Sequence, residues 1–146
     1  LSSIAYLEHL LVTEGPLTRR PPDGDQKKDI AFGFQTAKAV AGLDLGQTVC
    51  VKNQAVLAVE AMEGTDACIR RAGTLCDGSF TVVKVAKPRQ DLRFDVPVIG
   101  AGTLQALQEA NAAVLAVEAG KTLFFDKAHF LTEADKTGLV LVGTKC

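Results

Sequence analysis

Residues 47–73 read QTVCVKNQAVLAVEAMEGTDACIRRAG, and this stretch decides the fold class. Two valine-rich runs flank Asn53 and Gln54, which predicts two short strands joined by a tight turn. A helix is expected directly afterwards, because apolar residues then recur at helical spacing and Thr65 or Asp66 can cap its start. Two strands followed at once by a helix indicate an α/β domain.

Strand and helix signals continue to alternate on both sides of this stretch. Upstream, apolar residues between Asp29 and Gly42 recur at helical spacing, although Gly33 weakens the predicted helix. Downstream, the patterns predict strands at 80–85, 96–99 and 138–143. A helix follows the GAG motif of 100–102 and is established by Leu104. A second hairpin is predicted over 113–126, with its turn at Ala119 and Gly120, and a short helical stretch precedes the last strand. We expect one α/β domain with a mixed β-sheet of short strands and hairpins against packed helices.

The septet AVLAVEA occurs twice, at 55–61 and at 113–119. An identical septet raises the hypothesis of an internal duplication. The flanking sequences do not support it, because the first copy precedes a helix and the second is predicted to continue into a hairpin. Small apolar residues are used in many strands, so chance repetition is the simpler interpretation.

Composition and charge argue against several functional classes. The 146 residues carry a formal net charge of -1, and no basic stripe with interleaved aromatics is present, so nucleic-acid binding is not expected. With no Trp and one Tyr, the core is expected to consist of Val, Leu, Ile and Ala. The four cysteines lack C-x-x-C spacing and the two histidines lie far apart, which indicates reduced thiols rather than a zinc site.

The amino-terminal region differs in composition from the remainder. Residues 13–28 hold three of the five prolines and many charges, which predicts an exposed loop or linker. We expect 1–28 to be a connector and loop from a missing upstream domain, and 29–146 to be a C-terminal catalytic domain. No apolar run approaches the ~20 residues of a membrane span and no signal peptide is recognisable, so a cytoplasmic protein is expected.

Charged residues are concentrated after the predicted strand at 80–85. From Asp91 to Val96, charged and apolar residues alternate with the period of an extended strand, which puts Asp91, Arg93 and Asp95 on one face. A solvated edge strand has the same pattern. Four residues of extended chain span ~13 Å, whereas the ligands of Mg²⁺ lie ~2.0–2.1 Å from the ion. Asp91 and Asp95 are therefore not expected to share one ion unless the chain bends between them.

Basic residues precede this alternating pattern. Lys84, Lys87 and Arg89 bring the segment 84–95 to four basic and two acidic side chains, and that balance suits a diphosphate with a metal ion. Taken singly, Lys87 and Arg89 are also typical surface residues.

The second candidate region is EGTD, residues 63–66, together with Glu60. Its glycine permits a sharp turn, and a junction of strand, turn and helix presents free backbone N–H groups to anions. Asp66 has the alternative of simply capping the helix. Glu60 and Glu63 have no local lysine to pair with, which favours a functional role. Gln47 and the GAG motif are weaker candidates.

Three strings carry a resemblance to a known family: DIAFGF at 29–34, DLGQTVCVKNQAVLAVEAMEGTDACIRRAG at 44–73 and KVAKPRQDLRFDVPVIGAGT at 84–103. From about Gly15 to Gly143 the chain resembles the C-terminal domain of LpxI, a bacterial family of UDP-2,3-diacylglucosamine pyrophosphatases. The resemblance implies hydrolysis of UDP-2,3-diacylglucosamine to UMP and 2,3-diacylglucosamine 1-phosphate (lipid X), a step toward lipid A. It also implies a divalent cation such as Mg²⁺ and attack of water on the α-phosphorus.

This resemblance suggests partners and residue roles. The substrate is expected in a cleft between this domain and the missing amino-terminal domain, at the cytoplasmic surface of the inner membrane, with a homo-oligomer left open. Asp91 is expected to bind the metal or orient water, and Asp95 to fix Arg93 or complete the metal shell. Glu63, as a third catalytic residue, is expected opposite them. The expected substrate-binding residues are Gln47, Thr65, Asp66, Lys84, Lys87, Gln90 and Arg93.

Two alternatives from other functional classes stay open at this stage. One is a module that binds a nucleotide sugar or a lipid phosphate without turning it over, with the charged row as its docking surface. The other is a structural domain with a solvated charged edge, which predicts neither binding nor activity. UMP release that depends on a metal ion separates the enzyme from both.

Overall fold

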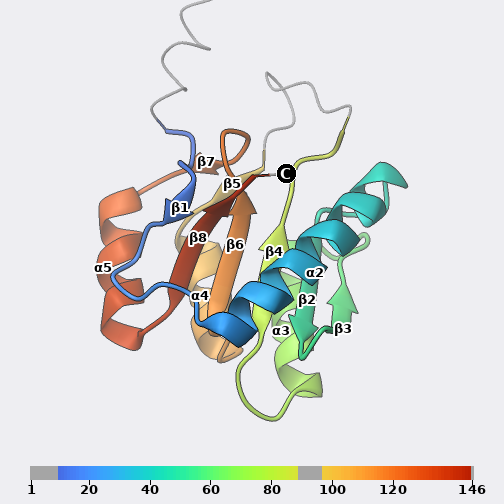
Figure 1. Cartoon of the computed structure of the whole chain (residues 1–146), viewed down its shortest axis with the longest axis horizontal. Coiled ribbons are helices and arrows are strands. Elements are labelled where there is room, and N and C mark those ends of the chain that lie inside the picture. Colours follow the sequence, from blue (N-terminus) through green and yellow to red (C-terminus); the bar gives the residue numbers. More distant parts are fainter. Residues whose placement is uncertain (1–9, 89–96, 146) are drawn as a thin grey trace, which may run out of the picture.

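In the computed structural model, which describes residues 10–88 and 97–145, the chain forms a six-stranded sheet with helices on both faces (Figure 1). The strands are β1 (Gly15–Pro16), β2 (Thr48–Lys52), β3 (Ala55–Val59), β4 (Thr81–Lys84), β5 (Val98–Ile99), β6 (Val114–Glu118), β7 (Leu123–Phe124) and β8 (Val140–Thr144). The helices are α2 (Gly24–Gly42), α3 (Thr65–Leu75), α4 (Ala101–Glu109) and α5 (Lys127–Thr137). Within the described part, none of these helices combines the length and the apolar character that crossing a bilayer requires.

The centre of the large sheet is parallel and its margins are antiparallel. The strand order is β1-β8-β6-β4-β2-β3, in which β4, β6 and β8 run parallel, while β5 and β7 form a separate two-stranded sheet. Parallel neighbours need crossover connections, and α4 and α5 lie in the two crossovers. The expected α/β class with a mixed sheet is confirmed.

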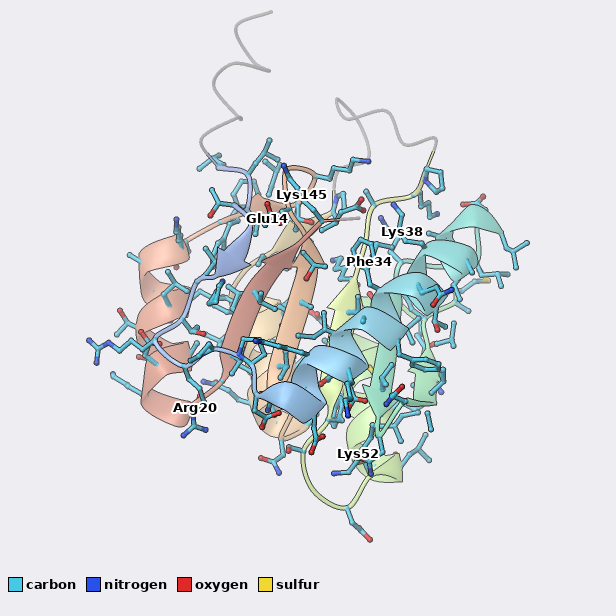
Figure 2. All side chains as sticks on the ribbon, in the orientation of Figure 1. Glu14, Arg20, Phe34, Lys38, Lys52 and Lys145 are labelled. Carbon is cyan, nitrogen blue, oxygen red and sulfur yellow. The ribbon has the colours of Figure 1, made fainter. Side chains whose placement is uncertain are left out.

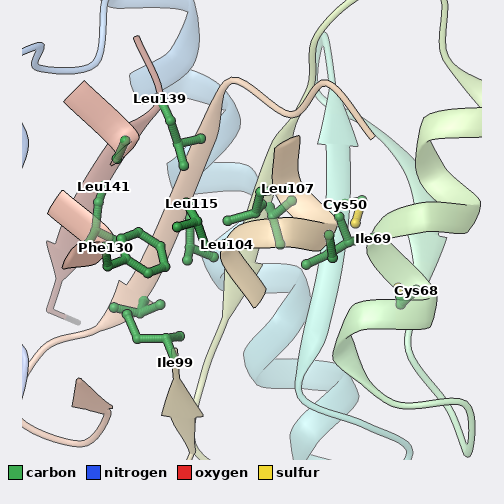
Figure 3. Packing of buried hydrophobic residues seen from close by; sticks show 14 of the residues in the cluster. Cys50, Cys68, Ile69, Ile99, Leu104, Leu107, Leu115, Phe130, Leu139 and Leu141 are labelled. Carbon is green, nitrogen blue, oxygen red and sulfur yellow. The ribbon is translucent and has the colours of Figure 1, made fainter. Parts of the chain in front are cut away.

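Helix α2 covers one face of the sheet, and α3, α4 and α5 cover the other (Figure 1). Successive residues of each strand alternate between the two faces. Val83 of β4 joins the core beneath α2, whereas Val82 joins the core beneath the other three helices. In that second core Leu115, Leu141 and Phe130 lie close together (Figure 3). The same alternation turns Lys84, two residues after Val82, toward the face that α3 and α4 cover.

The region 13–28, predicted as a loop, is partly built into the fold. β1 pairs with β8 at the edge of the sheet, and α2 begins at Gly24 rather than at Asp29. The start is fixed by a capping box, in which Asp23 accepts from the Gln26 N–H and the Gln26 side chain accepts from the Asp23 N–H. The predicted start of this helix at Asp29 therefore lies five residues too late, because the capping signal at Asp23 and Gln26 was not used.

Helix α2 is held to the sheet by two close contacts. A Cβ on Gly33 would lie 2.7 Å from a methyl carbon of Val83, so glycine permits the approach of helix and strand. The Asp29 carboxylate accepts hydrogen bonds from the N–H groups of Asn53 and Gln54, at 3.1 and 2.7 Å. Both turn residues have positive φ angles, as in the predicted hairpin between β2 and β3, which is confirmed.

The second predicted hairpin, over 113–126, is wrong. Both edges of β6 are occupied by β4 and β8, so β6 offers no edge to the segment that follows it. The chain turns near Gly120, whose φ is 77°, and continues into β7 of the small sheet. The two AVLAVEA copies thus form an antiparallel edge strand and a central parallel strand, which gives the duplication hypothesis no structural support.

Candidate active site

A pocket of about 340 Å³ opens at the carboxyl end of β4. Its walls come from the start of α3, the end of β4, β5 and the start of α4, and the lining residues are Glu63, Gly64, Thr65, Asp66, Ala67, Lys84, Val98 and Thr103. In sheets of this class, ligands bind outside the carboxyl ends of the parallel strands. The position of the pocket is therefore typical of a binding site.

Lys84 supplies a positive charge to this pocket. The residue is 7% exposed, and its Nζ donates a hydrogen bond to the carbonyl oxygen of Val98 at 3.0 Å. Burial lowers the pKa of Lys84, and the nearby carboxylates of Glu60 and Asp66 oppose that shift. A buried ammonium group is costly without anionic partners, and these two carboxylates supply part of that stabilisation.

Helix α3 begins at the pocket without a side-chain cap. Its N-cap is Gly64, whose φ of 92° is a conformation that favours glycine. Thr65 and Asp66 are instead the first helical residues, so the prediction that one of them caps the helix is wrong. The first hydrogen bond of the helix joins the Cys68 N–H to the Gly64 carbonyl at 3.1 Å. The N–H groups before Cys68 have no acceptor within the helix, and Thr65, Asp66 and Ala67 line the pocket.

Helix α4 contributes a second amino-terminal turn to the same pocket. The Thr103 hydroxyl donates to Oδ1 of Asp66 at 3.2 Å, which joins the starts of α3 and α4. Gly102 lies against this contact, since a Cβ there would be 3.2 Å from Oδ2 of Asp66. The N-cap Gly100 also lacks a side-chain cap. Two helix starts, each favourable to negative charge, therefore face one lysine.

Thr65 and Gln47 belong to a polar chain behind the pocket. The Thr65 hydroxyl lies 3.1 Å from that of Thr48 and 3.5 Å from Oε1 of Glu60. The same oxygen of Glu60 accepts from the backbone N–H of Gln47 at 3.2 Å. The Gln47 side chain donates to the carbonyl oxygen of Val85 at 3.2 Å, and Gln47 does not line the pocket. It therefore supports the end of β4 from behind.

Glu63 has a basic partner that the sequence analysis did not find. Arg71 donates from Nε and Nη2 to the two carboxylate oxygens of Glu63, each at 3.0 Å. Nη2 of Arg71 also donates to the carbonyl oxygen of Val59 at 2.9 Å. The hydrogen bonds from Arg71 lower the pKa of Glu63, so this wall of the pocket carries a fixed carboxylate. No lysine is involved, and the pairing arginine lies eight positions further along α3.

Lys87 forms an ion pair with Asp44 at the surface of the domain. Its Nζ is 2.8 Å from Oδ1 of Asp44, and it does not line the pocket. Its hydrogen bond and charge lower the pKa of Asp44. The remaining predicted site residues lie outside the described ranges and stay predictions. They are Gln90, Asp91, Arg93 and Asp95.

Two comparisons with known proteins lead to the same family. Residues 13–142 match the LpxI C-terminal domain. The chain belongs to the LpxI family. A relative named UDP-2,3-diacylglucosamine pyrophosphatase LpxI, from Caulobacter vibrioides, is 33% identical over 142 residues, which cover 92% of this chain and 51% of the relative. The chain thus spans about half the length of that relative.

The structure brings together four of the residues that the sequence predicted. Glu63, Thr65, Asp66 and Lys84 line one pocket although β4 and α3 are separated in sequence. Thr103 was missed, since only the GAG motif before it was named, as a weaker candidate. A hydroxyl next to a glycine-rich helix start was the signal that could have identified it.

A metal ion at this pocket would need ligands besides the described side chains. Among residues 10–88 and 97–145, no group of three or more His, Cys, Asp or Glu side chains could hold a metal ion by itself. Asp66 nevertheless offers a carboxylate inside the pocket. Mg²⁺ is commonly bound by one or two carboxylates, waters and the phosphates of a substrate. Asp66 is the pocket carboxylate that could serve as one such ligand.

Proposed function

We propose that this chain is the catalytic domain of a hydrolase that cleaves UDP-2,3-diacylglucosamine to UMP and 2,3-diacylglucosamine 1-phosphate. The observation that carries the proposal is the buried Lys84 between the amino-terminal turns of α3 and α4. A buried ammonium and two helix starts together suit the oxygens of a diphosphate. Family membership and the printed name of the Caulobacter vibrioides relative supply the nucleotide sugar.

The pocket residues bind the diphosphate and stabilise charge during its cleavage. Water attacks the α-phosphorus, and the bond from that phosphorus to the bridging oxygen breaks, so that the sugar 1-phosphate leaves. Lys84 and the N–H groups at the starts of α3 and α4 bind the phosphate oxygens, on which negative charge is concentrated. The hydroxyls of Thr65 and Thr103 are hydrogen-bonded to Glu60 and Asp66, and they position these carboxylates beside the phosphate site.

Carboxylates on the pocket wall are assigned to the metal and to water. Asp66, together with Asp91 or Asp95 from the following segment, would hold Mg²⁺, which supplies Lewis-acid polarisation of a phosphoryl oxygen when bound. Glu63 is fixed by Arg71 and stays ionised, so it is suited to orient the attacking water by accepting a hydrogen bond from it. Arg93 remains assigned to the phosphates.

The test is release of UMP from UDP-2,3-diacylglucosamine with and without Mg²⁺. It is run on the chain and on the chain joined to the part of the Caulobacter vibrioides relative outside the match. We expect Lys84→Met to lower kcat/KM at least ~100-fold, because a buried donor to the transition state is removed. Lys52→Met is the matched control, since Lys52 also donates from Nζ to a backbone carbonyl, that of Ser79 at 2.8 Å, but lies away from the pocket.

Three results would count against this assignment. Equal rates for Lys84→Met and Lys52→Met would remove the pocket from the reaction. Substrate binding without UMP in the presence of Mg²⁺ would indicate a non-catalytic binding module instead. Near-normal rates in both Asp91→Ala and Asp95→Ala would show that these two carboxylates do not belong to the catalytic site.

A further inference from the structure

A groove of about 550 Å³ runs between α2 and strands β1 and β8, on the face of the sheet opposite the pocket. We call it the α2 groove. Its floor is formed by Ile30, Phe34 and Val142, and Lys145 stands at one end. Figure 2 shows Phe34 midway along α2, with Lys145 beyond the end of the sheet. The groove therefore extends along β8 toward the carboxyl edge of the sheet.

The floor of the α2 groove is the part of the core beneath α2 that is still exposed to solvent. Ile30, Phe34 and Val142 are 7%, 9% and 8% exposed, whereas every other buried member of that core is at most 2% exposed. The small remaining exposure of this core is thus concentrated at one place. Prolines on the loop before α2 add apolar walls. An apolar ligand would complete the packing there.

The α2 groove and the catalytic pocket open at the same edge of the sheet. Thr144 at the end of β8 is in register with Glu118, and Lys84 at the end of β4 is in register with the preceding residue, Val117. β8 and β4 are separated by β6 alone. With strands ~4.8 Å apart, the two strand ends lie about 10 Å from each other. The groove and the pocket therefore approach this edge from opposite faces of the sheet.

We propose that the α2 groove binds an acyl chain of the glycolipid whose diphosphate lies at Lys84. This inference rests on the proposed function and names the place of its apolar part. From Lys27 to Phe34, α2 offers about 10 Å of wall at 1.5 Å per residue, enough for a segment of an acyl chain. The lining includes Lys27 and Lys145, and no carboxylate. Lysine stems extend the apolar walls while their charged ends favour an anionic amphiphile.

Binding of a fluorescent acyl probe tests the groove directly. The probe is 11-(dansylamino)undecanoic acid, and Ala31→Trp fills the groove from its α2 wall, where Ala31 is exposed. Ala39→Trp is the matched control, because Ala39 is an exposed alanine of the same helix outside the groove. We expect at least ~10-fold weaker binding for Ala31→Trp and a change within about twofold for Ala39→Trp. Ala31→Arg with Ala39→Arg repeats the comparison if the tryptophan variant is unstable.

Competition and kinetics connect the groove to the substrate. UDP-2,3-diacylglucosamine is expected to displace the probe, whereas UDP-N-acetylglucosamine, which lacks long chains, is not. In the UMP assay, Ala31→Trp is expected to raise KM by at least ~10-fold with little change in kcat, the signature of lost ground-state binding.

The groove proposal and the proposed function fail in different ways. No saturable probe binding, equal binding in the two tryptophan variants, or probe loss caused by dimer formation in sedimentation would overturn the groove proposal. Absence of UMP release, together with probe binding that follows the expected pattern and is displaced by the glycolipid, would overturn the hydrolase assignment while supporting the acyl site.

Discussion

The septet AVLAVEA folds twice in this protein, and its two copies have different surroundings. At 55–61 it forms β3, an edge strand that pairs with β2 and whose first two residues are exposed. At 113–119 it forms β6, which lies between β4 and β8 and has all five strand residues buried. The local propensities are identical, so the difference in burial comes from the place of each copy in the sheet.

The glutamate of each copy shows the same effect on a charged group. Glu60 is partly exposed and belongs to the polar chain behind the pocket. Glu118 is 3% exposed, pairs with Lys38 of α2 at 3.1 Å and accepts from the N–H of Ala86 at 2.9 Å. Glu60 therefore forms hydrogen bonds behind the pocket, whereas Glu118 joins α2 to the centre of the sheet.

The largest expected contrast concerns the leucine of each copy. Leu115→Ala should destabilise the domain by about 2–5 kcal/mol, because Leu115 is fully buried and its truncation leaves a cavity. Leu57 is half-buried, so Leu57→Ala should cost about 1 kcal/mol. Urea unfolding measures both values. Equal losses would mean that the edge strand is as tightly packed as the central one.

The glutamates should give a smaller contrast. Glu118→Gln is expected to cost about 1–3 kcal/mol, because it leaves Lys38 without its charge partner in a largely buried setting. Glu60→Gln should change the free energy of unfolding by less than about 0.5 kcal/mol. Thermal unfolding of both variants at one pH is the measurement. A neutral Glu118→Gln would show that Lys38 reaches water when the pair is broken.

The smallest expected effect is a pH dependence of the free energy of unfolding, and Lys84 is its cause. This residue lies opposite Val117 of the second copy. Burial lowers the pKa of Lys84 in the folded state below its ordinary value of 10.5. Between the two pKa values the unfolded chain binds more protons, so the free energy of unfolding rises with pH. Relative to Lys84→Met, the unaltered chain should gain stability as pH rises toward 10.5. A constant difference over that window would contradict the buried charge.

Local patterns were sufficient to predict much of the fold. The β2–β3 hairpin and the helices α2 and α3 follow from turn residues and apolar spacing within short segments. The hairpin at 113–126 failed because the strand partners of β6 come from distant segments, which local pattern does not contain. The start of α2 was missed although its capping box was present at Asp23 and Gln26.

The candidate site was predictable in part for a similar reason. Glu63, Asp66 and Lys84 carry charges that stand out in an apolar chain, so they could be named from the sequence. The placement of Thr103 depends on the crossover through α4, and the pairing of Arg71 with Glu63 depends on how α3 turns back over the preceding loop. Neither contact produces a local sequence pattern from which it could be predicted. The charged row at 91–95 lies outside the described residues and stays a prediction.

The pocket lies at the seam between the antiparallel and the parallel parts of the sheet, and this has a kinetic consequence. A hairpin such as β2–β3 forms in about 1–10 μs, whereas pairing β4 with β6 must await closure of a long crossover. Lys84 meets the start of α3 through the β2–β4 pairing and the start of α4 only after that crossover has docked. In refolding experiments, formation of the complete pocket should therefore lag behind the far-ultraviolet signal of the helices, and it would report completion of the native state.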